Sequence, residues 1–177
     1  MMTDSLRRTV RLFAGLLALC ALGLAAGPAR TVILVRHAER AGGMTPDAPL
    51  SEAGRCRAEV LSAMLADAGV TRIYTSEAAR TEQTAAPLAE RLGLRPEITP
   101  ASDVDGLLAK LRGSAPEGVT LVVGHANTVP EIIRRLGGGT VPAIGDSEYD
   151  RMFVVTITGA NQASLLTLRF AGCSQKP

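Results

Sequence analysis

Two continuous apolar runs most constrain the fold of this chain, because each is long enough to form one buried strand. The runs are Thr31–Val35 and Val119–Val123, and β-branched side chains are frequent in both. An uninterrupted run of this kind is typical of a central strand that is buried on both faces of a parallel sheet. The two runs therefore predict an α/β domain.

Helical and extended patterns alternate along the chain around these two runs. The predicted helices cover about residues 51–68, 76–92, 103–111 and 126–136, and further strands cover 72–74, 152–158 and 163–170. Ser76 and Asp103 stand where helix N-caps are expected. Alternation of strands and helices is typical of a parallel sheet with crossover helices, and the last two strands suggest a hairpin. We expect one three-layer α/β/α sandwich with a mainly parallel central sheet over residues 30–177.

Residues 1–29 differ from the rest of the chain and have the order of a secretory signal peptide. Three arginines within the first 11 residues precede an uncharged run, Leu12–Ala26, which small residues follow. The run is 15 residues long, and a helix needs roughly 20 to cross a bilayer. We therefore expect cleavage after Ala26 or Ala29, no stable membrane span afterwards, and a periplasmic or secreted protein.

The formal charge of the chain argues against a nucleic-acid partner. Residues 1–29 hold three of the 19 basic residues and one of the 17 acidic residues, so the rest of the chain has no net formal charge. Proteins that bind nucleic acids usually present a basic surface to the phosphate backbone. This class of partner therefore has little support.

Two cysteines remain outside the predicted signal peptide, and their state stays open. Cys56 lies on a predicted helix and Cys173 lies near the end of the chain. An oxidising compartment favours a disulfide between them. Sequence spacing does not show whether their Cα atoms are close enough, so a disulfide and two separate thiols are both consistent with the sequence.

The chain contains two histidines, and each directly follows a predicted central strand. His37 comes after the run that ends at Arg36, and His125 comes after the run that ends at Gly124. In open α/β sheets ligands bind at the carboxyl ends of the strands, so the two imidazoles are expected to face each other. A single histidine there is equally well explained as a buried structural residue, but the pair indicates a functional site.

The residues around these histidines resemble the motifs of the histidine phosphatase and phosphoglycerate mutase superfamily. The matching segments, in chain order, are Arg36-His37-Ala38-Glu39, Tyr74-Thr75-Ser76 leading to Arg80, and Val122-Val123-Gly124-His125. The resemblance spans roughly residues 31–170. It implies a phosphoglycerate mutase-like fold and a phosphoryl-transfer site. Ala38 departs from the family pattern, which has glycine there.

The resemblance implies a role for each of these side chains. His37 is the expected catalytic nucleophile, which forms a phosphohistidine that water hydrolyses, while Arg36, Arg80 and His125 bind the phosphoryl oxygens and His125 also takes part in catalysis. Guanidinium groups suit that role because they donate two parallel hydrogen bonds and stay charged. Arg80 is alternatively a surface residue that pairs with Glu77. No metal or other cofactor is implied.

The general acid that protonates the leaving alcohol is the least defined part of the expected site. One branch of the family has an aspartate after the second histidine, where this chain has Ala126, and another has a glutamate after the second helix. Asp103 is the first candidate, Glu97 the second and Asp105 the third. Asp103 is equally well explained as a helix N-cap.

We therefore expect a metal-independent phosphatase that hydrolyses a small phosphate ester. Mutase activity is disfavoured, because the short loops leave little room for a lid. Two other classes of protein remain as alternatives. One is a phosphate-binding protein that lacks an effective acid, and the other is an exported structural domain with buried, inert histidines. The identity of the substrate and the oligomeric state are not indicated by the sequence.

Overall fold

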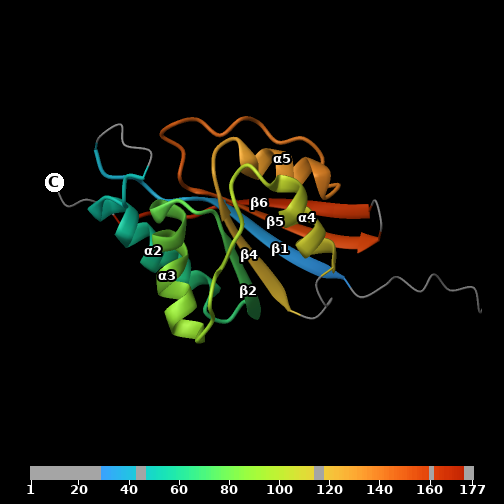
Figure 1. Ribbon diagram of the computed structural model, residues 1–177, viewed down its shortest axis with the longest axis horizontal. Coiled ribbons are helices and arrows are strands. Elements are labelled where there is room, and N and C mark those ends of the chain that lie inside the picture. Colours follow the sequence, from blue (N-terminus) through green and yellow to red (C-terminus); the bar gives the residue numbers. More distant parts are fainter. Residues whose placement is uncertain (1–28, 43–46, 114–117, 160–161, 174–177) are drawn as a thin grey trace, which may run out of the picture.

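The computed structural model describes residues 29–42, 47–113, 118–159 and 162–173 (Figure 1). Except for Ala29, the predicted signal peptide lies outside the described residues. Within these ranges, no helix is both long enough and apolar enough to cross a membrane.

A six-stranded sheet forms the centre of the described domain. Its strands are β1 (Arg30–Arg36), β2 (Val70–Thr75), β3 (Glu97–Ile98), β4 (Val119–Gly124), β5 (Arg151–Gly159) and β6 (Gln162–Arg169). They lie in the order β3-β2-β4-β1-β5-β6. The first four strands in this order pair in parallel, and β5 and β6 are antiparallel. The predicted mainly parallel sheet with a terminal hairpin is confirmed.

Helices cover both faces of the sheet. They are α2 (Glu52–Leu65), α3 (Ala79–Leu92), α4 (Val104–Gly113) and α5 (Thr128–Arg135). Side chains of β1 alternate between the two faces: Leu34 packs with residues of α4 and α5, whereas Val35 packs with residues of α2 and α3. Figure 1 shows the same grouping of the helices into two pairs. The predicted three-layer α/β/α sandwich is therefore confirmed.

Local signals place most helix ends correctly. The hydroxyl of Ser51 accepts a hydrogen bond from the Gly54 N–H, which starts α2. Asp103 Oδ1 accepts from the Gly106 N–H at 2.8 Å, which starts α4. Gly93 ends α3 with a positive φ of 66°, a conformation that glycine adopts at little cost. β3 was not predicted, since two residues are too few to show a period.

The prediction that Ser76 caps the second helix is wrong. α3 begins at Ala79, and its N-cap residue is Ala78, which has no side chain that can cap. Ser76 lies two residues earlier, and its hydroxyl contacts Thr81 Oγ1 and His125 Nε2, each at 2.9 Å. The hydroxyl therefore links α3 to a residue far away in the sequence.

The register of the central strands determines where the two histidines lie. β1 and β4 are parallel neighbours, and Arg36 and Gly124 are paired residues at their ends. The residue that follows each strand is a histidine, so both emerge at the same edge of the sheet. Since this edge is formed by the carboxyl ends of parallel strands, it is where a ligand site is expected.

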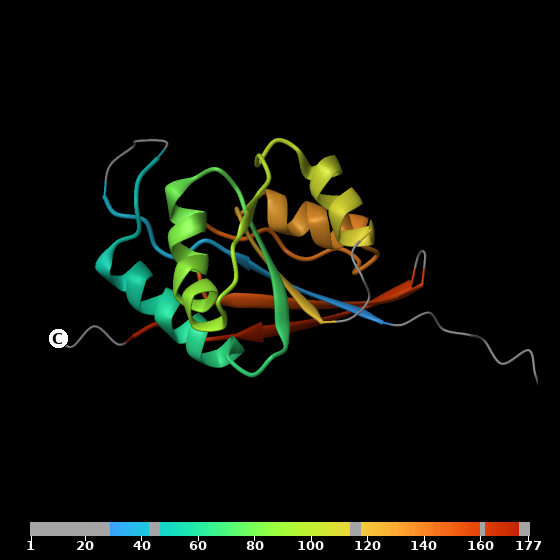
Figure 2. The ribbon, with the colours of Figure 1, turned by 60° about the horizontal axis from the view of Figure 1, so that its bottom comes forward.

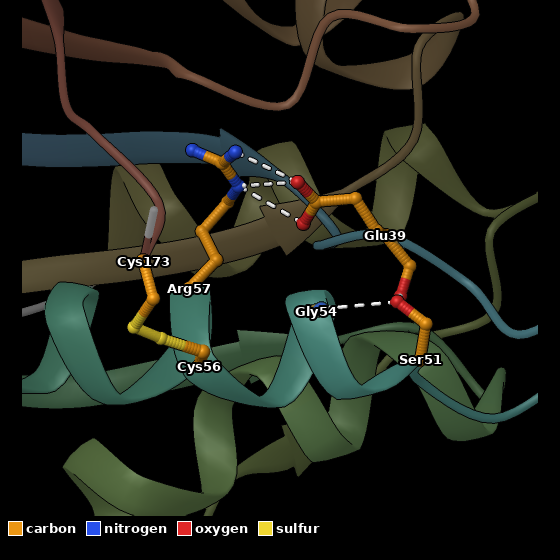
Figure 3. The surroundings of a disulfide bond; sticks show 6 residues. All are labelled: Glu39, Ser51, Gly54, Cys56, Arg57 and Cys173. Carbon is orange, nitrogen blue, oxygen red and sulfur yellow. Dashed lines mark hydrogen bonds and ion pairs between the residues drawn. A yellow bond between two sulfur atoms is a disulfide. The ribbon is translucent and has the colours of Figure 1, made fainter. Parts of the chain in front are cut away.

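The end of the chain is joined to α2 by a disulfide. Cys56 of α2 and Cys173 are bonded, with 5.8 Å between their Cα atoms (Figure 3). Figure 2 shows the chain leaving β6 and running toward α2. The sequence left the state of these cysteines open, and the structure pairs them.

Candidate active site

The backbone and the ring of His37 are both fixed by hydrogen bonds. Its N–H donates to the Gly124 carbonyl at 2.9 Å, across the ends of β1 and β4. Its ring Nδ1 lies 2.8 Å from the Ala38 carbonyl oxygen. Because a carbonyl only accepts, Nδ1 must carry the proton, and Nε2 keeps its lone pair. The buried imidazole is therefore held as the tautomer that can attack through Nε2.

The pKa of His37 is lowered to about 4. Burial is the largest cause, since it disfavours the charged imidazolium, and only 5% of the residue is exposed. The hydrogen bond to Ala38 raises the pKa, but the charges of Arg80 and Arg36 lower it further, as does His125. At neutral pH the ring is consequently uncharged, which is the state that a nucleophile requires.

His125 faces His37 across the site. The centroids of the two rings are 5.5 Å apart, and the rings are inclined at 65°. Nη2 of Arg80 lies 3.3 Å from His125 Nδ1, and the Ser76 hydroxyl lies 2.9 Å from Nε2. A guanidinium can only donate, so Nδ1 accepts and the proton is on Nε2, which donates to Ser76. Arg80 thus contacts the site and is more than a surface residue.

The pKa of His125 is also lowered. Burial is the main cause, followed by the positive charge of Arg80, while the carboxylate of Glu77 acts in the opposite direction. Glu77 Oε2 accepts a hydrogen bond from the Ala101 N–H at 2.8 Å. The sequence suggested Glu77 only as an alternative partner of Arg80, but its negative charge also raises the pKa of His125.

Arg36 ends β1, and its guanidinium turns toward the segment before β5. Nη1 donates to the carbonyl oxygens of Gly145 at 2.7 Å and of Asp146 and Glu148 at 3.1 Å each. Nε is buried, and it has no hydrogen-bond partner among the described residues. A buried donor without an acceptor is costly, so this N–H is suited to bind an anion.

The loop after His37 is held from two sides. Thr84 Oγ1 accepts from the Ala38 N–H at 3.0 Å and donates to the Arg80 carbonyl at 2.7 Å. The Ala38 side chain is buried against Leu50 and Ala58. No residue other than glycine has a positive φ in the described ranges, so alanine fits where the family pattern has glycine.

Glu39 has a structural partner and is not merely a loop charge. Its carboxylate forms a two-pronged ion pair with Nε and Nη2 of Arg57 (Figure 3). Arg57 Nη1 also donates to the Phe170 carbonyl. Burial raises the pKa of Glu39, but the hydrogen bonds and charge of Arg57 outweigh it, so the pKa is lowered. Arg57 therefore links the loop after His37 to the end of the chain.

The three predicted candidates for the general acid occupy different positions. Asp103 is the N-cap of α4, and it lines the same small pocket as His125 and Ser76. Glu97, on edge strand β3, lies 3.9 Å from Lys110, and Asp105 is exposed and paired with Arg135. Of these three carboxylates, the structure brings only Asp103 to the pocket beside His125.

Sequence reasoning missed one aromatic side chain at the site. The ring of Tyr149 covers the Arg36 guanidinium, with 4.2 Å from Cζ to the ring centroid, and its centroid is 6.1 Å from that of His37. Tyr149 is one of two tyrosines in the chain and lies outside the motifs noted in the sequence. No local pattern could reveal it, because it reaches Arg36 only through the fold.

Part of the chain matches the model of one protein family. The model of the histidine phosphatase superfamily (branch 1) matches residues 32–103, which include Arg36, His37 and Arg80. The proposed phosphohistidine phosphatase SixA from Nakamurella multipartitia is 26% identical, with a TM-score of 0.60 over 81% of this chain and 98% of that one. The match covers less than half of the chain, and both the match and the fold make this domain similar to the histidine phosphatase superfamily.

Two further solved structures share the fold at lower identity. The protein histidine phosphatase SixA complexed with tungstate is 22% identical, with a TM-score of 0.65 over 78% of this chain and 96% of that one. The mycobacterial glucosyl-3-phosphoglycerate phosphatase complexed with inorganic phosphate is 17% identical, with a TM-score of 0.61 over 78% of this chain and 95% of that one. At these identities the likeness concerns the fold.

A curated relative is much longer than this chain. The PE-PGRS family protein PE_PGRS11 of Mycobacterium tuberculosis is 30% identical over 149 residues. The match covers 77% of this chain but 24% of that protein. The chain thus spans a minor part of the length of this relative.

Proposed function

We propose that this chain is an exported, metal-independent phosphatase that hydrolyses a phosphate ester through a phosphohistidine on His37. The observation that carries the proposal is the state of His37. Its Nδ1 proton is bound to the Ala38 carbonyl and its pKa is lowered to about 4, so Nε2 has a free lone pair at neutral pH. The match to the model of the histidine phosphatase superfamily supports phosphatase activity.

The cations around His37 suit a phosphoryl group. Arg36 and Arg80 are close enough to lower the pKa of His37, and Arg36 Nε is buried without a partner. A transferred phosphoryl group spreads its negative charge over three oxygens, which fixed guanidinium groups stabilise. The same charges that add to the effect of burial in lowering the pKa of His37 would therefore bind the substrate.

In the proposed reaction, His37 Nε2 forms a bond to phosphorus while the bond from phosphorus to the leaving oxygen breaks. The leaving oxygen takes the bonding electron pair and a proton from a general acid. The Ala38 carbonyl accepts from Nδ1 throughout and stabilises the charge on the phosphorylated ring. Water then attacks phosphorus and gives a proton back to the deprotonated general acid, which now acts as the base. The phosphorus–nitrogen bond breaks, its electron pair returns to Nε2, inorganic phosphate is released and His37 is neutral again.

Two independent features support export. The basic and then apolar order of residues 1–29 is that of a signal peptide. The Cys56–Cys173 disulfide suits an oxidising compartment, because thiols stay reduced in the cytosol. Both features favour a periplasmic or secreted enzyme.

The direct test is hydrolysis of p-nitrophenyl phosphate with a chelator present, comparing the purified protein with the His37→Ala variant. We expect the parent to turn over and the variant to lose activity by at least about 10³-fold, since the nucleophile is absent. Acid-labile 32P labelling of the parent but not of the variant would identify the phosphohistidine. Activity that persists in His37→Ala, or that needs an added metal, contradicts the proposal.

A second candidate function is supported by the acidic residues. Asp103 is engaged as a helix cap, and Glu97 and Asp105 face Lys110 and Arg135. A domain with the cationic site but without an effective acid would bind phosphate and turn over slowly or not at all. Phosphate binding without hydrolysis of either p-nitrophenyl phosphate or an alkyl phosphate would favour this function.

A further inference from the structure

The segment between α5 and β5 encloses the guanidinium of Arg36. Three backbone carbonyls of this segment accept hydrogen bonds from one nitrogen, Nη1. They belong to Gly145, Asp146 and Glu148. The segment is itself tied together, because the Glu148 N–H donates to the Gly145 carbonyl at 3.0 Å and the Gly145 N–H donates to Glu148 Oε2 at 2.7 Å. The Glu148 carboxylate is also paired with Arg151 of β5. Arg36 is therefore held by a closed turn and not by an open loop.

Tyr149 follows this turn directly and contacts a different part of the same guanidinium. Its ring centroid lies 4.2 Å from Arg36 Cζ, a distance at which the ring face attracts the cation. The ring centroid is also 6.1 Å from that of His37. Tyr149 thus lies beside the proposed nucleophile and against one of the proposed phosphate-binding groups.

One part of the Arg36 guanidinium has contacts within the protein, and another part has no hydrogen-bond partner among the described residues. Nη1 has three carbonyl acceptors and one face of the group has the tyrosine ring, whereas the buried Nε has no acceptor among the described residues. Nε and Nη2 form the edge through which arginine binds oxyanions with two parallel hydrogen bonds. A ring face that lies against a guanidinium hinders the rotation of its plane about the last side-chain bonds, in addition to the hydrogen bonds of Nη1.

We propose that Tyr149 is the positioning residue of the phosphate site, and that its ring holds Arg36 so that the Nε edge binds a phosphoryl oxygen. This inference rests on the proposed function, because it assigns a role within the same site. The ring face makes the contact and the hydroxyl does not, so phenylalanine can replace tyrosine. The role is exerted through Arg36, so it disappears when the guanidinium is removed.

The test measures the affinity for inorganic phosphate by calorimetry, together with the kinetics of p-nitrophenyl phosphate hydrolysis. We expect Tyr149→Ala to weaken phosphate binding about tenfold and to raise KM more than it lowers kcat. Tyr149→Phe should bind phosphate as the parent does. Ser147→Ala changes an exposed residue of the same turn and is the matched control. A melting curve of each variant verifies that it is folded.

A double-mutant cycle separates positioning from direct contact with phosphate. In an Arg36→Met background, Tyr149→Ala should cause no further loss of affinity. A further loss there, or unchanged phosphate affinity of folded Tyr149→Ala in the parent background, overturns the inference. Tyr149→Leu repeats the measurement with a similar volume and no aromatic face, should the alanine variant unfold. A parent that binds phosphate but hydrolyses nothing contradicts the proposed activity and not the role of Tyr149.

Discussion

His37 and His125 differ in the partners of their ring nitrogens, although both follow a central strand. His37 donates from Nδ1 to a backbone carbonyl, whereas Nδ1 of His125 accepts from Arg80. The proton is therefore on opposite nitrogens in the two rings, and in both the pKa is lowered mainly by burial. One imidazole is prepared to attack and the other to donate from Nε2.

The lowered pKa of His37 predicts the behaviour of its ring on acidification. Because the folded pKa is about 4 and the ordinary value is 6.5, the unfolded chain binds a proton first as the pH falls. The neutral, buried state of His37 therefore contributes fully to the stability of the fold above pH 6.5, and this contribution is lost as the pH falls from 6.5 to about 4. With two histidines in the chain, imidazole signals in an NMR titration can be assigned with His37→Ala. A titration of the His37 signal with a midpoint near pH 6.5 would contradict the lowered pKa.

Asp103 can be tested separately as a helix cap and as a general acid. Asparagine caps a helix about as well as aspartate, but it cannot donate a proton to a leaving group. If Asp103 only caps α4, Asp103→Asn keeps kcat and stability, whereas Asp103→Ala loses about 1 kcal/mol of stability. If Asp103 is the acid, both variants lose kcat on an alkyl phosphate by about 10²-fold or more. Urea unfolding and steady-state kinetics measure the two effects.

The predictability of individual site residues depends on whether their role is local. The positions of His37 and His125 after apolar runs could be predicted, because strand ends are visible in the sequence. The contact of Ser76 with His125 and that of Tyr149 with Arg36 could not, since each joins segments that only the sheet order brings together. Asp103 was predicted as a cap from its position alone, and the structure confirms that bond.

At the scale of elements, α2 is seated closely against the loop that follows β1. The Glu39 carbonyl accepts from the N–H and the hydroxyl of Ser51, and a Cβ added at Gly54 would collide with the same carbonyl oxygen. Glycine is therefore required there by close approach and not by its φ angle. This contact fixes the start of α2 relative to the residues next to His37.

We expect Gly54→Ala to destabilise the protein by about 1–3 kcal/mol, because the helix and the loop must move apart. Gly42→Ala is the control, since a Cβ at that position has no atom within 4 Å. Urea unfolding of both variants gives the difference in free energy. Equal stability of the two variants would show that the loop moves without cost.

The helices and the long strands were predictable because their periods are local. The edge strand β3 was not, because its pairing with β2 involves two residues, Glu97 and Ile98. The predicted start of α3 was three residues too early, at residue 76 and not at Ala79, because the prediction made Ser76 its cap. A serine just before a helix looks the same in the sequence whether its hydroxyl caps that helix or bonds to a distant residue, so sequence alone does not separate these roles.

For the whole molecule, the Cys56–Cys173 disulfide closes a long segment. The two residues are 117 positions apart, and closing a loop of this length restricts the unfolded chain strongly. We expect Cys173→Ser to lower the free energy of unfolding by about 2–5 kcal/mol. A reductant should destabilise the parent by a similar amount and leave the variant unchanged. Equal stability of parent and variant under oxidising conditions would contradict a disulfide in solution.

The architecture of the whole molecule followed from the alternation of strand and helix patterns, whereas the order of the strands did not. β1 lies between β4 and β5, and these neighbours are distant from it in the sequence. Nothing in a local window indicates which strand is its neighbour. The resemblance of the sequence motifs to a family implied the type of fold, but the order of the strands was not predicted.

The disulfide also divides the molecule into a covalent ring and a tail. The ring runs from residue 56 to residue 173 and contains Arg80, His125 and Tyr149, whereas His37 lies on the tail before it. A single peptide cut within the ring leaves every residue attached, but a cut between residues 37 and 56 detaches strand β1 together with His37. That strand would then stay in place only through its pairing with β4 and β5 and its packing.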